Sequence, residues 1–147
     1  MKISFRRKSV IILLVGYSLL LAYWMIWGFG RMSHSGYMYN LTPFSTIKHF
    51  IQIDKFNTET WIINLIGNIG VFVPFGILIP LVFRTRLLKT LIIALLGLFI
   101  LETTQLITMK GSFDVDDFIL NISGVIVGYV ILIIFKMLIK SRSGDII

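Results

Sequence analysis

The chain has 147 residues, of which 56% are hydrophobic and 14% carry a charge, and its formal net charge is +7. The charged fraction lies well below the roughly 25% that is usual in soluble domains, and the mean hydropathy is +0.90. This composition excludes a soluble domain and indicates a membrane protein. Because the chain has no cysteine, disulfides, thiol nucleophiles and cysteine-ligated zinc sites are excluded as well.

Four apolar stretches are long enough to span a bilayer, since a transmembrane helix needs about 20 mostly apolar residues. In chain order they are Val10–Gly28, Trp61–Phe83, Thr90–Thr108 and Phe118–Ile139. The first also resembles a signal peptide, but its apolar run exceeds the usual length of about 7 to 15 residues and no small-residue cleavage site follows it. We therefore predict an all-α membrane protein with four transmembrane helices and one domain over residues 1–147.

The basic residues predict how these helices are oriented. Ten of the fourteen flank the helices on one side, namely Lys2, Arg6, Arg7, Lys8, Arg84, Arg86, Lys89, Lys136, Lys140 and Arg142. By the positive-inside rule this side is cytoplasmic, so both termini are expected in the cytoplasm. The segments Phe29–Thr60 and Lys110–Asp116 are then expected outside. Since the positive charge reports orientation, no nucleic-acid partner is predicted.

The segment between the first two transmembrane helices is too long for a simple turn. Thr42 is a suitable helix cap with Pro43 at the first helical position, and apolar residues follow at helical spacing: Phe44, Ile47 and Ile51. We predict an amphipathic helix from Pro43 to Ile53 that lies along the outer surface of the membrane. A loop packed on the helix ends is the alternative.

Polar side chains recur at helical spacing on the other three transmembrane helices. The pairs are Asn64 and Asn68, Glu102 and Gln105, and Asp117 and Asn121. Because a helix rises about 1.5 Å per residue, each pair lies within roughly 10 Å of the predicted outer end of its helix. We therefore expect these side chains to meet in one polar patch at the outer side of the membrane.

Glu102 is the carboxylate that is predicted deepest in the membrane. Such a group costs about 2.5 to 3.5 kcal/mol, which favours a functional role. Glu102 and Asp117 are candidate catalytic residues, with one protonated and the other ionised for acid and base work. In the alternative interpretation Glu102 is protonated and only holds helices together through hydrogen bonds.

Three carboxylates, Asp114, Asp116 and Asp117, gather just before the fourth transmembrane helix. Oxygen ligands of this kind suit Ca²⁺ or Mg²⁺, but the spacing is not that of an EF-hand loop. Carboxylates are also favoured at a helix N-terminus, where Asp116 could be the cap. No metal and no cofactor are predicted. Within the fourth helix, Gly124 and Gly128 form a small-residue packing face.

Three blocks of the sequence resemble, in order and spacing, the signature blocks of the VanZ-like family of small bacterial membrane proteins. They are NLTPFSTI (Asn40–Ile47), NLIGNIGVFVPFG (Asn64–Gly76) and the stretch from ETTQ to GSFDVDDFILNISGVIVGY (Glu102–Tyr129). The resemblance covers most of the chain after the first helix. It implies a multi-helix protein of the bacterial cytoplasmic membrane, and the family's namesake is associated with low-level resistance to the lipoglycopeptide teicoplanin. No catalytic assignment follows from it.

Carried over residue by residue, the family pattern points to Asn40, Pro43, Phe44, Asn64, Asn68, Pro74, Gly76, Glu102, Gln105, Asp114, Asp117, Asn121 and Gly124. We expect the binding residues to be Asn40, Pro43, Phe44, Asn64, Asn68, Gln105, Asp114, Asp116 and Asn121. The chain departs from the pattern at Gly111, where the family usually has an arginine; Lys110 lies beside it. A lysine does not replace a bidentate arginine, which argues against carrying an anion site over to this position.

The sequence thus predicts a protein that acts at the outer face of the membrane on a lipid-linked envelope component or an amphiphilic glycopeptide antibiotic. Its expected partners are membrane lipid and either a lipid-linked cell-wall precursor or a lipoglycopeptide. Two alternatives stay open. One is an intramembrane acid/base enzyme that uses Glu102 and Asp117 on a lipid-linked substrate, and the other is a structural or regulatory membrane partner. Oligomeric state is not predicted.

Overall fold

The computed structural model describes residues 5–28, 33–51 and 58–144. Along the chain the elements are α1 (Phe5–Trp27), β1 (Met38–Asn40), α2 (Ser45–Ile51), α3 (Thr58–Phe83), α4 (Leu87–Ile107), β2 (Ser112–Asp114) and α5 (Val115–Gly144). Over these residues, four helices are long and apolar enough to cross a membrane: Arg7–Trp27, Leu65–Phe83, Leu87–Ile107 and Val115–Ser141. The predicted helical membrane protein with four spans is confirmed, with helix ends that differ by a few residues.

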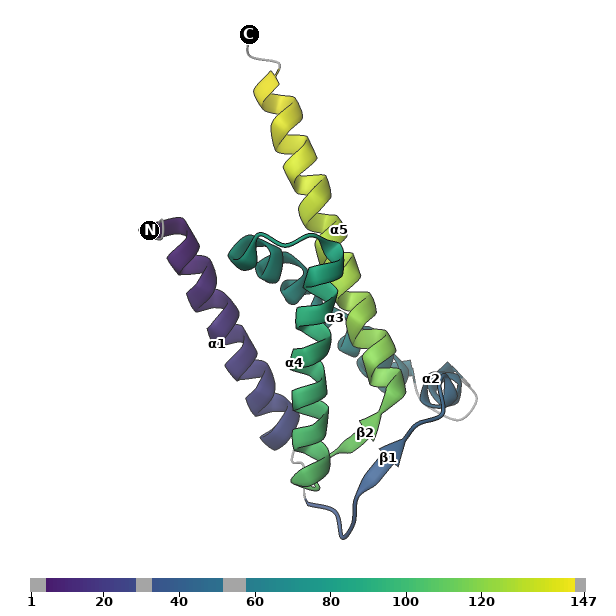
Figure 1. Cartoon of the computed structure of the whole chain (residues 1–147). Coiled ribbons are helices and arrows are strands. Elements are labelled where there is room, and N and C mark those ends of the chain that lie inside the picture. The colour runs from purple at the N-terminus through teal and green to yellow at the C-terminus, as the bar shows by residue number, and fades with distance from the viewer. Residues whose placement is uncertain (1–4, 29–32, 52–57, 145–147) are drawn as a thin grey trace.

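The bundle has two distinct ends. The N-terminal end of α1 and the C-terminal end of α5 lie at one end, and α2 lies with the two strands at the other (Figure 1). An even number of spans brings the two ends of the chain to the same end of the bundle. Which end faces the cytoplasm stays a prediction from the basic residues.

The centre of the bundle is the contact between α3 and α5, which glycines allow to be unusually close. A Cβ atom added to Gly76 would lie 2.1 Å from the carbonyl oxygen of Val125, and one added to Gly128 would lie 2.0 Å from that of Val73. Gly124 approaches α3 in the same way. Small residues let transmembrane helices approach and gain dispersion contacts where no hydrophobic effect drives their association. The predicted packing face on the last helix is therefore confirmed.

Apolar side chains divide between this core and the outside of the bundle. The buried cluster consists of Leu21, Phe72, Ile79, Ala94, Leu98 and Val125. Many equally apolar side chains point outward, such as Ile12 and Leu88, which are 70% and 71% exposed. In a soluble protein such a surface would aggregate, whereas in a bilayer it is the surface that meets lipid tails.

Two side chains of α1 attach it to α3. Pro74 lies inside α3 and has no N–H group to donate to the carbonyl of the preceding turn. Beside this interrupted turn, the Tyr17 hydroxyl donates to the carbonyl oxygen of Val71 at 2.7 Å. At the C-terminal end of α3, Arg7 Nε donates to the carbonyl oxygen of Val82 at 3.1 Å, where the helix dipole favours a cation.

The turn after α4 is fixed by its own backbone. Met109 adopts a left-handed conformation with φ of 54°, its N–H donates to the carbonyl oxygen of Leu106, and the N–H of Lys110 donates to that of Gln105, both at 3.1 Å. This is a Schellman ending, which satisfies the last carbonyls of a helix. The N–H of His34 then bonds the Met109 carbonyl oxygen at 2.8 Å, which brings the segment after α1 to this turn.

The sequence predicted only a turn between the last two transmembrane helices, and the structure adds a strand there. β1 and β2 form a parallel pair in which Met38, Tyr39 and Asn40 lie opposite Ser112, Phe113 and Asp114. The pair joins two segments that lie more than 70 residues apart in the chain. It thereby places Asn40 beside the start of α5.

The short helix α2 falls within the predicted range Pro43–Ile53, whose last two residues lie outside the described residues. Thr42 and Pro43 precede the helix and do not begin it, because Phe44 takes a left-handed conformation with φ of 64°. The alternative of a loop is therefore wrong for Ser45–Ile51. That α2 lies along the membrane surface stays a prediction.

Candidate functional site

The structure separates the predicted site residues into two groups. Asn40, Asp114 and Asp116 form a cluster that fastens α2 and β1 to the start of α5, which we call the docking cluster. Asn68, Glu102, Gln105, Asp117 and Asn121 line a separate cavity. Asp116 and Asp117 are neighbours in the chain but belong to different groups.

Asp116 is fully buried and binds the backbone that leads into α2. Its Oδ1 accepts a hydrogen bond from the N–H of Phe44 at 2.5 Å, and its Oδ2 accepts from the N–H groups of Thr46 at 2.7 Å and Ile47 at 3.0 Å. The first N–H groups of a helix have no partner within it. A carboxylate on α5 thus caps α2, and the interpretation that Asp116 caps its own helix is wrong.

Asp114 caps α5 instead. Its Oδ1 accepts from the backbone N–H of Asp116 at 2.8 Å, two residues on, as an N-cap side chain does. The same oxygen accepts from Asn40 Nδ2 at 3.2 Å, and Oδ2 accepts from the Thr46 hydroxyl at 2.6 Å. Among the described residues, no group of three or more histidines and carboxylates could hold a metal ion. Asp114 and Asp116, two of the three clustered carboxylates, thus use their oxygens in hydrogen bonds within the chain.

Three predicted binding residues, Asn40, Pro43 and Phe44, lie between the end of β1 and the start of α2. Pro43 is exposed, and the Phe44 side chain is 52% exposed while its backbone N–H is held by Asp116. Asn40 donates to the hydroxyls of Ser45 at 2.6 Å and Thr46 at 2.9 Å. A binding role for these residues stays a prediction.

The second group lines a cavity of about 140 Å³, which we call the polar cavity. Its walls come from α1, α3, α4, β2 and α5, and its lining residues are Leu21, Met25, Asn68, Val71, Phe72, Glu102, Gln105, Ser112, Asp117 and Asn121. Five of the six side chains expected in one polar patch are among them. The side chain of the sixth, Asn64, lies outside the described residues.

Two amides hold the walls of the polar cavity together. Gln105 Nε2 donates to the carbonyl oxygen of Met25 at 2.6 Å, near the end of α1, and Asn68 Nδ2 donates to Asp117 Oδ1 at 2.9 Å. Both bonds join different helices, so Gln105 and Asn68 each fasten two helices together, whereas this role stays a prediction for Glu102. The Asn68 bond also fixes the direction in which Asp117 presents its carboxylate.

Glu102 and Asn121 are almost completely buried in the polar cavity, with exposed fractions of 1% and 2%. The Asn121 Oδ1 atom accepts no hydrogen bond from the residues that the structure describes. A buried carbonyl oxygen is nearly always hydrogen-bonded, because it has lost its water. Oδ1 of Asn121 therefore marks a place where a further hydrogen-bond donor would be stabilised.

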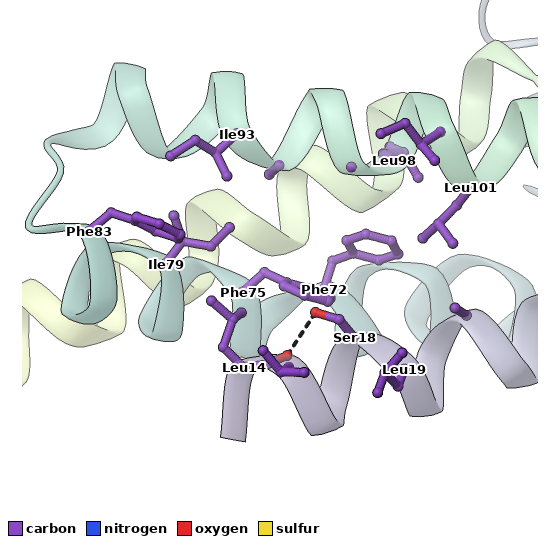
Figure 2. Close-up of a pocket in the computed structure, with 15 residues that line it drawn as sticks. Leu14, Ser18, Leu19, Phe72, Phe75, Ile79, Phe83, Ile93, Leu98 and Leu101 are labelled. Carbon is purple, nitrogen blue, oxygen red and sulfur yellow. Dashed lines mark hydrogen bonds between the residues drawn. The ribbon is translucent and has the colours of Figure 1, made fainter. Parts of the chain in front are cut away.

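A larger hollow of about 500 Å³ lies between α1, α3 and α4, and we call it the apolar groove. Figure 2 shows aromatic and aliphatic side chains of α3, including Phe72 and Ile79, between Leu14 and Leu19 of α1 and Leu98 of α4. Its one hydroxyl, on Ser18, donates to the carbonyl of Leu14 in its own helix at 2.7 Å. The groove thus offers a hydrocarbon lining.

The apolar groove and the polar cavity lie next to each other. Phe72 lines both. On α4, the groove residues run from Ile93 to Leu101, and the next residue, Glu102, already lines the polar cavity. On α3 and α1 the change occurs at the same level, since Phe72 and Ala22 end the groove where Asn68 and Met25 line the cavity. The two hollows therefore adjoin, one apolar and one polar, at the level of Phe72.

Comparison with known families gives a match to VanZ/LLP1 over residues 9–136, which contain both hollows and the docking cluster. The chain belongs to the VanZ/LLP1 family. No curated protein and no solved structure matches it. Family membership and the four apolar helices make it a multi-pass membrane protein, consistent with the bacterial cytoplasmic membrane.

At the position where an arginine is usual in the VanZ-like blocks, this VanZ/LLP1 member has the buried Gly111. The neighbouring Lys110 places its ammonium group 5.0 Å from the centre of the Trp27 ring, at the end of α1. That is a cation–π contact. Lys110 does not line the polar cavity, and no lysine, arginine or histidine is among the described residues that do.

Proposed function

We propose that this protein binds an amphiphile at the outer face of the membrane, with the tail in the apolar groove and the head group in the polar cavity. The occupant would be a lipid-linked envelope component or an amphiphilic glycopeptide antibiotic, and the role would be in the cell envelope or in antibiotic resistance. The observation that carries the proposal is that the two hollows adjoin at Phe72, which lines both. Their volumes suit a ligand with a long tail and a small head.

The two hollows would contribute differently to binding. An alkyl chain that moves from the bilayer into the apolar groove exchanges one hydrocarbon environment for another, so the hydrophobic effect adds little inside a membrane. Selectivity would come from the polar groups, because buried donors and acceptors are costly when they have no partner. The polar cavity is thus the part that distinguishes one amphiphile from another.

A second candidate function is supported by the shared position of two carboxyl groups. Glu102 and Asp117 both line the polar cavity, and Asp117 is oriented by Asn68. Two carboxyl groups around one small space are the arrangement that acid and base catalysis uses. In this alternative the amphiphile would be a substrate whose head group reacts in the cavity.

The test of amphiphile binding fills the apolar groove. A Cβ atom on Gly97 meets nothing within 4 Å, and Gly97 lines the groove. Gly97→Phe would therefore place a ring at the wall of the groove. Gly16→Phe is the matched control, because Gly16 is an equally open helical glycine that does not line the groove.

The readout is teicoplanin susceptibility, measured together with the amount of protein in the membrane. We expect Gly97→Phe to lose resistance at an unchanged protein level and Gly16→Phe to keep it. Glu102→Gln keeps the shape of the side chain and removes its ability to ionise, so loss of resistance in this variant as well would extend the function to the polar cavity. Full resistance in both Gly97→Phe and Glu102→Gln would contradict the proposal.

A further inference from the structure

We propose that the two-stranded sheet is a membrane-contact surface, with the Tyr39 side chain in the lipid headgroup region and Phe113 beside it at the edge of the hydrocarbon layer. By the orientation predicted from the basic residues, this is the outer leaflet. The inference goes beyond the proposed function, because it concerns the lipid around the protein and not the contents of either hollow. It begins from the two faces of the sheet.

The two faces of the sheet have different surroundings. Side chains alternate between the faces of a strand, and residues that lie opposite each other in a pair share a face. One face carries Ser112, which lines the polar cavity, and Asp114, which accepts a hydrogen bond from Asn40 at 3.2 Å. Phe113 and its partner Tyr39 lie on the other face. The sheet therefore has a face toward the polar cavity and the docking cluster and a second, aromatic face.

Phe113 joins the aromatic face to the outer surface of the bundle. Its ring packs edge-to-face against Phe99 of α4, with centroids 6.2 Å apart, and against Phe118 of α5 at 5.4 Å. The Phe99 side chain is 53% exposed and shares one side of α4 with the exposed Ile92 and Leu95. An apolar stripe of this kind meets lipid tails in a bilayer. The aromatic face thus continues the lipid-facing surface of α4.

Tyr39 lies at the margin of this surface, where its side chain is 68% exposed. Figure 1 shows β1 on the side of β2 that faces away from the helices, so Tyr39 lies beyond Phe113. Tyrosine has an apolar ring and a polar hydroxyl, and it is enriched at membrane–water interfaces for this reason. The order from Phe99 through Phe113 to Tyr39 runs from purely apolar rings to one with a hydroxyl, as a path from tails to headgroups requires.

The backbone of the sheet limits how deep it can lie. Within the described part of the chain the sheet has two strands, so β1 has one edge without a neighbouring strand. An open sheet edge does not occur in the hydrocarbon layer, because its N–H and C=O groups would find no partner there. In the headgroup region water reaches these groups. The edge of the hydrocarbon layer therefore lies between Phe99 and β1.

The last turns of α1 carry aromatic side chains at the same end of the bundle. Tyr23, Trp24 and Trp27 are 58%, 44% and 57% exposed. The Trp27 ring lies under the ammonium group of Lys110, in the turn that leads to β2. Exposed tryptophan and tyrosine at one level form the aromatic belt of a membrane protein. Tyr39 adds the sheet to this belt.

Nitroxide spin labels on single cysteines test the inference, because the chain has no cysteine of its own. The full-length protein, labelled at Tyr39→Cys, Phe99→Cys or Ser35→Cys, is placed in vesicles of phosphatidylcholine and phosphatidylglycerol. All three positions are exposed. Relaxation by molecular oxygen, which concentrates among lipid tails, is compared with relaxation by a water-soluble nickel chelate. We expect the ratio of oxygen to nickel accessibility to be highest at Phe99→Cys, and at Tyr39→Cys to be several-fold above that at Ser35→Cys.

Met38→Cys is the matched control, because Met38 is the neighbouring strand residue, is 46% exposed and shares the face of Ser112. Its accessibility ratio should be lower than that of Tyr39→Cys. Equal ratios at Tyr39→Cys and Ser35→Cys would place the sheet in water. Low accessibility of Tyr39→Cys to both reagents would show that protein, such as a second copy of the chain, covers the aromatic face. Either result, or a ratio at Met38→Cys as high as at Tyr39→Cys, would overturn the inference.

Discussion

Replacing Asp116 with alanine tests whether the start of α2 is held by a carboxylate from α5. The side chain accepts three backbone hydrogen bonds, from Phe44, Thr46 and Ile47. A hydrogen bond to a charged group contributes about 1.5 to 3 kcal/mol, and a buried donor left without a partner costs a similar amount. Because Phe44 is exposed and Thr46 and Ile47 are half-buried, water would replace some of the lost hydrogen bonds. We take about 1 kcal/mol per donor, which gives about 3 kcal/mol in all.

Amide hydrogen exchange of residues 44–51 in detergent micelles, read by mass spectrometry, measures this loss directly. A change of about 3 kcal/mol in the free energy of local opening corresponds to roughly a hundredfold faster exchange. Asp117→Ala is the matched control, since this neighbouring carboxylate binds Asn68 on α3 and leaves α2 untouched in the contacts described above. Exchange in Asp116→Ala as slow as in the unmodified protein would refute the capping role of Asp116.

Two further predictions concern orientation and packing. Because the chain has no cysteine, single cysteines can be placed at Ser35 and Arg86, both of which are exposed. We expect an impermeant thiol reagent to label Ser35→Cys and not Arg86→Cys in intact cells. Labelling of Arg86→Cys and not of Ser35→Cys would show the opposite orientation. Gly128→Ala should lower the free energy of unfolding by about 1 to 3 kcal/mol, because its Cβ would lie 2.0 Å from the Val73 carbonyl oxygen. Thermal unfolding in detergent measures this effect against Gly70→Ala, whose Cβ meets nothing within 4 Å; equal midpoints would contradict the packing argument.

The parts of the fold that depend on helix geometry could be predicted from the sequence. Four apolar runs fix four spans, and a constant rise per residue places Asn68, Glu102 and Asn121 at one depth. Their meeting in one cavity required only that the helices pack side by side. Gly124 and Gly128 could be assigned to packing because a small residue at every fourth position leaves one face of a helix flat.

Other features depend on partners that the sequence does not reveal. The strands have three residues each, too few for alternation to identify them. The role of Asp116 was missed because it binds backbone N–H groups about 70 residues earlier, and any residue type supplies those. The apolar groove was missed because Leu98, which lines it, is the same residue type as Leu96, which is 60% exposed.

The docking cluster also sets the order in which the protein can be completed during translation. Phe44, Thr46 and Ile47 emerge from the ribosome 72, 70 and 69 residues before Asp116, which binds their N–H groups. Over that interval the partner strand of β1 is absent as well, because β2 immediately precedes α5. β1 and the backbone that leads into α2 must therefore wait for these partners while α3 and α4 are synthesised and inserted. The arrival of α5 closes this segment, so an early part of the polypeptide acquires its final structure only when the last helix begins.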